Sequence, residues 1–543
     1  MATPYISLED VSFVLPNGEI LFSHVNEHFG QCPTGLVGRN GSGKSVLARI
    51  LAGQLHPTQG RCVRSGAVHY LAQQVSAQDG TTVTDLAGLR GVFDALQRIE
   101  NGSCAQADFD LVDSHWDAPA QLANALAQEG LGHLDAHAPA SALSGGESMR
   151  VALVGAVLSN ADFLILDEPS NHLDQPSRLR LIEWLQQWRK GLLVISHDRQ
   201  LLAAMARIVE LSSLGLRSYG GNYAFYANAK AQEQQHALND LERARLERKR
   251  EEQALRDQRE RQEKRQARAA RSGKEANQAK SLLDHQKERS DQSMGKLQRQ
   301  QTQTRTELAQ RVRHAAAQVA EDVHIHLHAP MSNGVAQRQV LALDYLELPP
   351  FVPPPLQHIS LQVNGQQRIG LIGPNGIGKS TLLKVIAGRI DALSGLCKVT
   401  GRVAYLDQRL DCLDAKRSTI EVLQDVNRRL SENELRMRLA QLGMDAQKIA
   451  VPTDSLSGGE RLKAALACVI YADEPPQLLL LDEPSNHLDL PSLAALEALL
   501  TGYGGALIVT SHDQEFLKRL RLTDLLHAGS NGWNLKSFED SLQ

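Results

Sequence analysis

Two glycine-rich segments have the residue types and spacing that bind phosphate. Residues 38–45 read GRNGSGKS, and residues 373–380 read GPNGIGKS. Glycines leave backbone N–H groups free to surround phosphate oxygens, and a helix that follows directs its positive end at them. A lysine and a hydroxyl at the end of such a loop contact the β- and γ-phosphates and Mg²⁺. The sequence therefore predicts two ATP sites.

The residues expected to bind ATP share these two loops and the first helical turn after them. They are Gly38, Asn40, Gly41, Ser42, Gly43, Lys44 and Ser45 in the first loop, and Gly373, Asn375, Gly376, Ile377, Gly378, Lys379, Ser380 and Thr381 in the second. Ser45 and Ser380 are also predicted Mg²⁺ ligands.

An aspartate followed by a glutamate ends an apolar run in each half of the chain. Asp167 and Asp482 stand where such an acid holds Mg²⁺. The next residues, Glu168 and Glu483, are predicted general bases for the attacking water.

A histidine follows each glutamate at the same interval. His197 and His512 lie 29 residues beyond Glu168 and Glu483. A single histidine is more often structural, but this repeated placement favours a contact to the γ-phosphate.

The two halves are a tandem repeat. Lys44 and Lys379 are 335 residues apart, Ser144 and Ser457 are 313 apart, and the glutamates and histidines are each 315 apart. The first half therefore carries 22 extra residues before Ser144, which we expect within about residues 98–120. A register this regular indicates duplication.

Each half reads as an α/β domain. Short continuous apolar runs such as residues 163–166 and 478–481 end at the candidate site residues. Apolar strands without alternation indicate a parallel sheet covered on both faces, and ligands bind at the carboxyl ends of such strands.

Bulk composition narrows the class of protein. The chain has 543 residues and a formal net charge of −4, so it is not uniformly basic. The six cysteines lack the spacing of zinc or iron–sulfur sites, which favours a reducing compartment. No stretch is long and apolar enough to span a bilayer. We expect a cytoplasmic protein without a membrane segment.

The segment of about residues 228–320 differs from both halves. It is rich in Glu, Gln, Lys, Arg and Ala, which favour helix. We expect two antiparallel helices, about 230–270 and 275–320, with the break at Ser272–Gly273. Residues 241–313 hold 21 basic and 12 acidic side chains, a charge of +9, which leaves −13 elsewhere. A solvated spacer is the alternative, but a basic rod favours contact with RNA.

The order of these motifs resembles that of the ATP-binding cassette superfamily. It comprises the phosphate loops, Gln73 and Gln408, the Leu-Ser-Gly-Gly-Glu segments, the Asp-Glu pairs and the histidines. The resemblance implies that Gln73 and Gln408 contact Mg²⁺ and water. It also implies that each Leu-Ser-Gly-Gly-Glu segment caps the ATP of the opposite half. The capping residues would be Ser457, Gly458 and Gly459 for the first loop, and Ser144, Gly145 and Gly146 for the second.

The ring that would stack on adenine is less defined. Phe13 precedes Gly38 by 25 residues, whereas the equivalent position in the second half is Leu348. Tyr345 or Phe351 could replace it, or these rings could simply pack.

Two cassettes joined by a charged helical linker resemble the ABC-F family, although Ser170 and Ser485 stand where that family usually has Thr. The resemblance implies two tandem cassette domains, 1–227 and 326–543, and a helical hairpin linker, 228–325, that contacts tRNA or rRNA on the ribosome. The candidate RNA contacts, near an expected tip at residues 270–280, are Arg265, Arg268, Arg271 and Lys274.

The expected function is that of a monomeric ATPase acting on translation through ATP-gated closure of the cassettes. A ribosome-protecting antibiotic-resistance factor of the same family and the ATPase subunit of a transporter remain alternatives. A DNA-repair ATPase is disfavoured because its motifs are separated by far longer coiled coils or zinc modules. A module that only binds ATP is disfavoured by the intact glutamates and histidines in both halves.

Overall fold

The computed structural model describes residues 3–72, 80–113, 115–171, 173–275, 302–304, 306–316, 338–407, 410, 413–486 and 488–538. Within 259–275 it describes the side chains of residues 260, 261, 264 and 268 only. The chain divides into two compact units. One comprises Met1–Tyr226 and His324–Gln543, and the other comprises Ala227–Val323.

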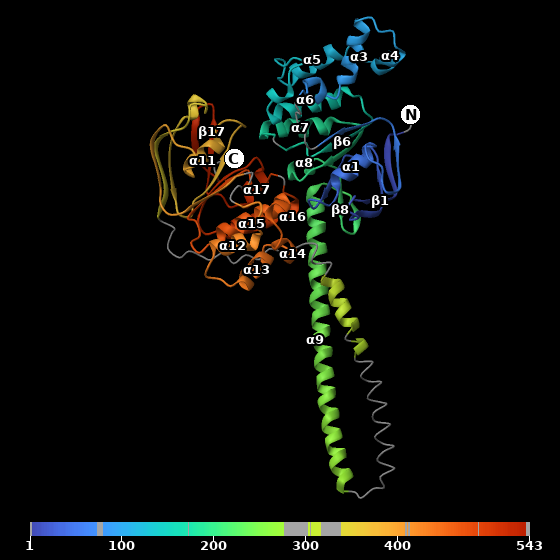
Figure 1. Cartoon of the computed structure of the whole chain (residues 1–543), viewed down its shortest axis with the longest axis vertical. Coiled ribbons are helices and arrows are strands. Elements are labelled where there is room, and N and C mark those ends of the chain that lie inside the picture. Colours follow the sequence, from blue (N-terminus) through green and yellow to red (C-terminus); the bar gives the residue numbers. More distant parts are fainter. Residues whose placement is uncertain are drawn as a thin grey trace. The chain divides into compact units, whose positions relative to one another are not determined.

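The first cassette is built on a six-stranded sheet and a three-stranded sheet (Figure 1). The larger has the order β5 (Val68–Leu71), β6 (Phe163–Asp167), β7 (Gly191–Ile195), β3 (Thr34–Gly38), β8 (Arg207–Ser212), β9 (Gly215–Tyr219). The smaller has the order β2 (Ile20–Phe29), β1 (Tyr5–Val14), β4 (Gln59–Ser65). All neighbours in the large sheet are parallel except β8 and β9.

The second cassette repeats both sheets in the same order. Its large sheet is β14 (Val403–Leu406), β15 (Leu478–Asp482), β16 (Ala506–Thr510), β12 (Arg368–Ile372), β17 (Asp524–Gly529), β18 (Gly532–Ser537). Its small sheet is β11 (His358–Asn364), β10 (Gln339–Glu347), β13 (Ser394–Val399). Tandem α/β domains are confirmed, whereas the antiparallel small sheets and the antiparallel edge strands β9 and β18 were not expected.

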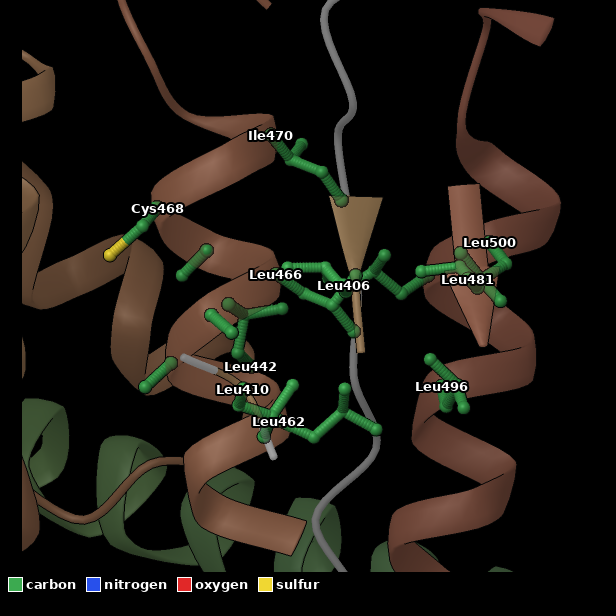
Figure 2. Packing of buried hydrophobic residues seen from close by; sticks show 14 of the residues in the cluster. Leu406, Leu410, Leu442, Leu462, Leu466, Cys468, Ile470, Leu481, Leu496 and Leu500 are labelled. Atoms are coloured by element: carbon green, nitrogen blue, oxygen red, sulfur yellow. The ribbon is translucent and has the colours of Figure 1, made fainter. Parts of the chain in front are cut away.

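Alternating leucines of β15 supply two different cores. Leu479 and Leu481 belong to one buried cluster, and Leu478 and Leu480 belong to another. Side chains of a strand point alternately to opposite faces, so both faces of the sheet are buried. Figure 2 shows Leu481 among leucines from neighbouring helices in the first of these clusters. This burial explains the uninterrupted apolar run and fixes Asp482 at the strand end.

Four pairs of helices follow the candidate site segments. They are α1 (Lys44–Ala52) and α11 (Lys379–Ile386), α6 (Gly145–Leu158) and α15 (Gly458–Ile470), α7 (Gln175–Gln187) and α16 (Leu490–Gly502), and α8 (Arg199–Ala203) and α17 (Gln514–Arg519). The first two pairs begin at or directly after predicted site residues, α8 and α17 begin two residues after the histidines, and α7 and α16 begin after Asp174 and Asp489.

The remaining helices account for the difference in length between the cassettes. The first cassette has α2 (Val83–Leu86), α3 (Arg90–Glu100), α4 (Gln106–Val112) and α5 (Ala118–Gln128); the second has α12 (Thr419–Val426), α13 (Glu432–Gln441) and α14 (Ala446–Ile449). Short 3₁₀ turns occupy Ala140–Ala142, Pro354–Leu356 and Thr453–Ser455.

The 22 extra residues begin earlier than expected. The buried leucines Leu122 and Leu126 of α5 match Leu435 and Leu439 of α13 at the 313-residue offset. The extra length therefore forms α3 and α4, starting near Arg90 rather than near residue 98. An ion pair of 2.7 Å between Arg98 Nη2 and Asp108 Oδ1 joins these two helices.

The second unit is dominated by α9 (Tyr223–Glu275), a helix of 53 residues. It continues through Ser272–Gly273, where we expected a break, because Gly weakens a helix by only about 1 kcal/mol. Residues 302–304 and 306–316 are also helical. Arg311 Nη1 lies 3.4 Å from Glu247 Oε1 of α9, and Leu241 and Leu308 are both buried. These contacts indicate that the two helical segments pack on each other.

Substitution of Leu308 by Asp should loosen this helical pair. The side chain is 7% exposed, and removing a buried leucine costs about 2–5 kcal/mol. Limited proteolysis of the full chain should then cut within residues 223–316 faster than in the wild type. Leu246→Asp is the matched control because Leu246 is 55% exposed. Equal protection of the Leu308→Asp variant and the wild type would contradict the packing.

Candidate functional site: two phosphate loops with their acids and histidines

The first phosphate loop is closed by glycines that a side chain could not replace. Gly43, with φ of 96°, caps α1, and a Cβ there would lie 2.6 Å from Leu21 Cδ2. Lys44 Nζ donates hydrogen bonds to the carbonyls of Gly38 (2.8 Å) and Arg39 (3.0 Å). The ammonium group is therefore held in the middle of the loop, beside the N-terminus of α1.

The second loop has the same geometry. Gly378, with φ of 106°, caps α11, and Lys379 Nζ donates to the carbonyls of Gly373 (2.7 Å) and Pro374 (2.8 Å). Burial lowers the pKa of Lys44 and Lys379, while the neighbouring carboxylates act in the opposite direction. Both loops thus present a lysine where a phosphate would bind.

The aspartates that end β6 and β15 are fixed by hydroxyl groups. Ser380 Oγ donates to Asp482 Oδ1 at 3.0 Å, and Tyr405 OH donates to Asp482 Oδ2 at 3.1 Å. Tyr70 OH donates to Asp167 Oδ2 at 3.2 Å, repeating the tyrosine contact in the first cassette. The sequence interpretation missed both tyrosines, although each stands three residues before the glutamine of its half.

The oxygen-rich environment of these aspartates fits Mg²⁺. A hydroxyl and a carboxylate are hard ligands, and Mg²⁺ binds few protein groups besides phosphate and water. Ser45 also hydrogen-bonds the Asp167 side chain. Among the described residues no cluster of three or more His, Cys, Asp or Glu could hold a metal ion.

The two glutamates adopt a strained backbone conformation. Glu168 has φ of 51° and Glu483 has φ of 50°, in the left-handed region that non-glycine residues rarely adopt. The Glu168 N–H donates to the carbonyl of Ile195, and the Glu483 N–H donates to Thr510 Oγ1, each at 2.8 Å. The neighbouring strand therefore fixes each glutamate.

Burial controls the ionisation of the glutamates and histidines. It raises the pKa of Glu168 to about 8 and that of Glu483 to about 7. Burial, together with the positive charge of the nearby lysine, lowers the pKa of His197 and of His512 to about 3. The histidines are therefore neutral at pH 7, and the glutamates are poised to exchange a proton near that pH.

Each histidine lies against its glutamate. His197 Nε2 is 3.5 Å from Glu168 Oε1, and His512 Nε2 is 3.4 Å from Glu483 Oε1. His512 Nε2 also shares a hydrogen bond of 2.8 Å with Asn375 Oδ1 of the phosphate loop. The histidine thus joins the glutamate to the loop.

Several buried polar atoms at these sites have no hydrogen-bond partner among the described residues. They are Ser42 Oγ, both ring nitrogens of His197 and both carboxylate oxygens of Glu483. Such atoms are costly unless a ligand or water satisfies them. The Ser42 hydroxyl and a protonated ring nitrogen of His197 can donate to a phosphate, and the Glu483 carboxylate can accept from an attacking water.

The Leu-Ser-Gly-Gly-Glu segments form helix N-termini. Ser144 caps α6 and Ser457 caps α15, each in a capping box with the glutamate three residues later. The glycines that follow occupy the first helical turn, where backbone N–H groups have no intrahelical partner. This geometry suits an anion.

Residues of one cassette reach the phosphate loop of the other. Asp489, the N-cap of α16, accepts a hydrogen bond of 2.8 Å from the backbone N–H of Asn40. In the converse direction, the charge of Asp174 acts on Lys379. A cavity of about 690 Å³ beside the second loop is lined by Gln175 and Pro176 of the first cassette. The sequence interpretation did not assign these aspartates to the sites.

The two glutamines and the candidate adenine-stacking residues need separate mention. Gln73 and Gln408 lie outside the described residues. Leu348 is fully buried, whereas Tyr345 and Phe351 are 79% and 70% exposed. Phe13 lies on β1 near Phe22, with ring centroids 6.2 Å apart.

The paired sheets, phosphate loops and acids define a tandem ATP-binding cassette ATPase. The family model described as "ABC transporter" matches residues 30–171 and 356–486. The chain is 31% identical over 516 residues to the energy-dependent translational throttle protein EttA of Mycobacterium tuberculosis, covering 89% of this chain and 84% of that protein. It is 30% identical over 516 residues to the tylosin resistance ATP-binding protein TlrC of Streptomyces fradiae, covering 89% of this chain and 90% of that protein.

The chain therefore belongs to the ABC-F family of ATP-binding cassette proteins and is an ATPase. A solved structure of the archaeal ribosome recycling factor aABCE1, in complex with the ribosomal stalk protein aP1, has the same fold. It matches with a TM-score of 0.59 at 18% identity, over 98% of this chain and 91% of that one. Among the described residues, no helix is both long and apolar enough to cross a membrane.

Replacing both glutamates by Gln should stabilise the nucleotide-free protein at alkaline pH. An acid whose pKa is raised by folding keeps a proton that the unfolded chain loses, so stability falls as pH rises from about 4.5 through 7 to 8. The Glu168→Gln, Glu483→Gln variant escapes this loss because Gln does not titrate. Its thermal midpoint should exceed that of the wild type by about 2–4 °C near pH 8.5 and by much less near pH 5. A difference independent of pH would contradict the raised pKa values.

Proposed function

We propose that this protein is a translation factor that binds the ribosome and uses ATP-gated closure of its cassettes to act there. The observation that carries the proposal is the contact from Asp489 to the backbone of Asn40, because it makes the first ATP site depend on the second cassette. The named relatives in translation and in tylosin resistance support a ribosomal target, reached in the cytoplasm.

The proposed roles follow the geometry of each site. Lys44 and Lys379 bind phosphate, and Ser45, Ser380, Asp167 and Asp482 hold Mg²⁺, with Gln73 and Gln408 beside it. Mg²⁺ would neutralise charge developing on the phosphates. Glu168 and Glu483 accept the proton of the attacking water, and the neutral His197 and His512 hydrogen-bond the γ-phosphate.

We propose that each ATP is capped by the opposite cassette. Ser457, Gly458 and Gly459 would cap the phosphate bound by Lys44, and Ser144, Gly145 and Gly146 would cap that bound by Lys379. Both segments begin helices of 13 or 14 residues, which supports an anion site. We propose that the chain has two cassette domains, residues 1–227 and 326–543, joined by a linker, residues 228–325. The two cassettes would pair within one monomer.

Phe351 is the better candidate for adenine stacking in the second cassette. It is exposed, and its neighbour Val352 lies against the phosphate loop, since a Cβ on Gly378 would be 2.9 Å from Val352 Cγ1. Phe13 is the corresponding candidate in the first cassette.

The linker is proposed to contact tRNA or rRNA. Residues 241–313 carry a charge of +9 on a chain of net charge −4, which favours a phosphate-rich partner at this segment alone. Arg268 is exposed on α9, and the side chains of Arg265, Arg271 and Lys274 lie outside those described. These four residues remain the proposed contacts.

A role in antibiotic resistance is the second candidate, because the similarity to TlrC is as extensive as that to EttA. Growth of a deletion strain with and without ribosome-targeting drugs separates the two. Hypersensitivity confined to such drugs favours resistance, and a growth defect without drugs favours a general factor.

The Glu168→Gln, Glu483→Gln variant should bind ATP without hydrolysing it and should co-sediment with ribosomes in the presence of ATP. Closure would persist because the bound nucleotide keeps favouring the closed state. Sedimentation through a sucrose cushion, with ATP, ADP or no nucleotide, measures this directly. Recovery of the variant free of ribosomes in ATP would sink the ribosomal proposal.

Three further variants separate the steps of this experiment. Adding Lys44→Ala and Lys379→Ala should abolish ribosome binding, because ATP no longer binds. Replacing Arg265, Arg268, Arg271 and Lys274 by Gln should weaken ribosome binding while ATP binding stays. Replacing the four exposed residues Arg61, Arg189, Lys398 and Arg428 by Gln matches the lost charge outside the linker and should have little effect.

A further inference from the structure

Arg178 of α7 touches the histidine segments of both cassettes. Its Nε lies 3.1 Å from Asp198 Oδ2, and Asp198 directly follows His197. Its Nη1 donates a hydrogen bond of 3.2 Å to the backbone carbonyl of His512 in the second cassette. One guanidinium therefore connects the two segments that carry the γ-phosphate histidines.

These contacts are buried. The side chains of Arg178 and Asp198 are 10% and 6% exposed. In such an environment removing one partner of an ion pair is costly, because the other charge is left without compensation. A guanidinium can serve both partners at once, since its donors point in fixed and different directions within one plane. The position of the His512 segment thus depends on a residue of the first cassette.

The repeat does not reproduce this arrangement. At the 315-residue offset that relates His197 to His512, Arg178 corresponds to Leu493. Leu493 is buried on α16, and its side chain has no donor with which to bind the carbonyl of His197. The catalytic residues are the same in the two cassettes, but this support for them is not.

A neighbouring ion pair has the same one-sided character. Arg199 Nη1 of the first cassette lies 2.5 Å from Glu497 Oε1 of the second, and both side chains are buried. The corresponding positions, Gln514 and Ile182, hold no charge. Two arginines of the first cassette therefore reach into the second around its histidine segment.

We propose that Arg178 is a positioning residue. It makes hydrolysis at the Glu483 site depend on an arginine of the first cassette, whereas no corresponding arginine of the second cassette supports the Glu168 site. His512 bonds Asn375 of the phosphate loop and lies beside Glu483. Holding its carbonyl fixes the position of the histidine relative to both. The two sites thus hydrolyse ATP under different control. This inference rests on the ATPase activity and not on the ribosomal proposal.

The test is Arg178→Leu, which installs the residue of the second cassette, in the Glu168→Gln and Glu483→Gln backgrounds. Single-turnover hydrolysis of pre-bound ATP records slow as well as fast rates. With Glu168→Gln, where Glu483 is the remaining hydrolytic glutamate, Arg178→Leu should slow hydrolysis about tenfold. With Glu483→Gln the slowing should be clearly smaller, about twofold, because at the Glu168 site Arg178 touches the side chain of Asp198 beside His197 and not the backbone of the histidine itself.

Equal slowing in both backgrounds, slowing confined to the Glu483→Gln background, or no slowing would overturn the proposal. A general loss of structure would act on both sites alike, and the thermal midpoint monitors it. Arg178→Met, which keeps an unbranched side chain without the charge, replaces Arg178→Leu if that variant does not fold. Arg180→Leu is the matched control on the exposed face of α7 and should leave both rates unchanged.

Discussion

The backbone N–H of Asn40 donates to Asp489 across the two cassettes, and the rest of the site depends on contacts of this kind. A phosphate loop binds its ligand with backbone N–H groups, so anything that holds its backbone sets the geometry of the nucleotide. Because Asp489 also caps α16, the same carboxylate couples the start of a helix in one cassette to the loop of the other. The backbone of the first phosphate loop is therefore held in part by a residue of the second cassette.

Within each cassette, local structure fixes the residues that we propose as catalytic relative to one another. The buried leucines of β15 end the strand at Asp482, and the turn that follows forces Glu483 into a left-handed conformation. Its N–H is satisfied by Thr510 of the adjacent strand. The strain is thus stabilised by neighbouring strands rather than by the site itself. Burial then raises the pKa of Glu483, which suits a base that must accept a proton near neutral pH.

The sequence predicted the parts of the structure that rest on local chemistry. Glycine spacing, apolar runs and the constant offset predicted the phosphate loops, the tandem α/β domains and the acids at the ends of apolar strands. It did not predict contacts between residues distant along the chain, such as Tyr405 with Asp482 or Arg178 with His512. Nor did it predict that α9 runs through Ser272–Gly273, because one glycine among strong helix formers is too weak a stop signal. Long-range packing decides these features.

The most direct test of the account asks whether a residue of the second cassette controls hydrolysis in the first. Asp489→Ser keeps a side chain able to cap α16 but removes the reach to Asn40. Combined with Glu483→Gln, it leaves every hydrolytic residue of the Glu168 site in place. The account predicts that single-turnover hydrolysis at the Glu168 site falls about tenfold or more. An unchanged rate would contradict the claim that each ATP site is built by both cassettes.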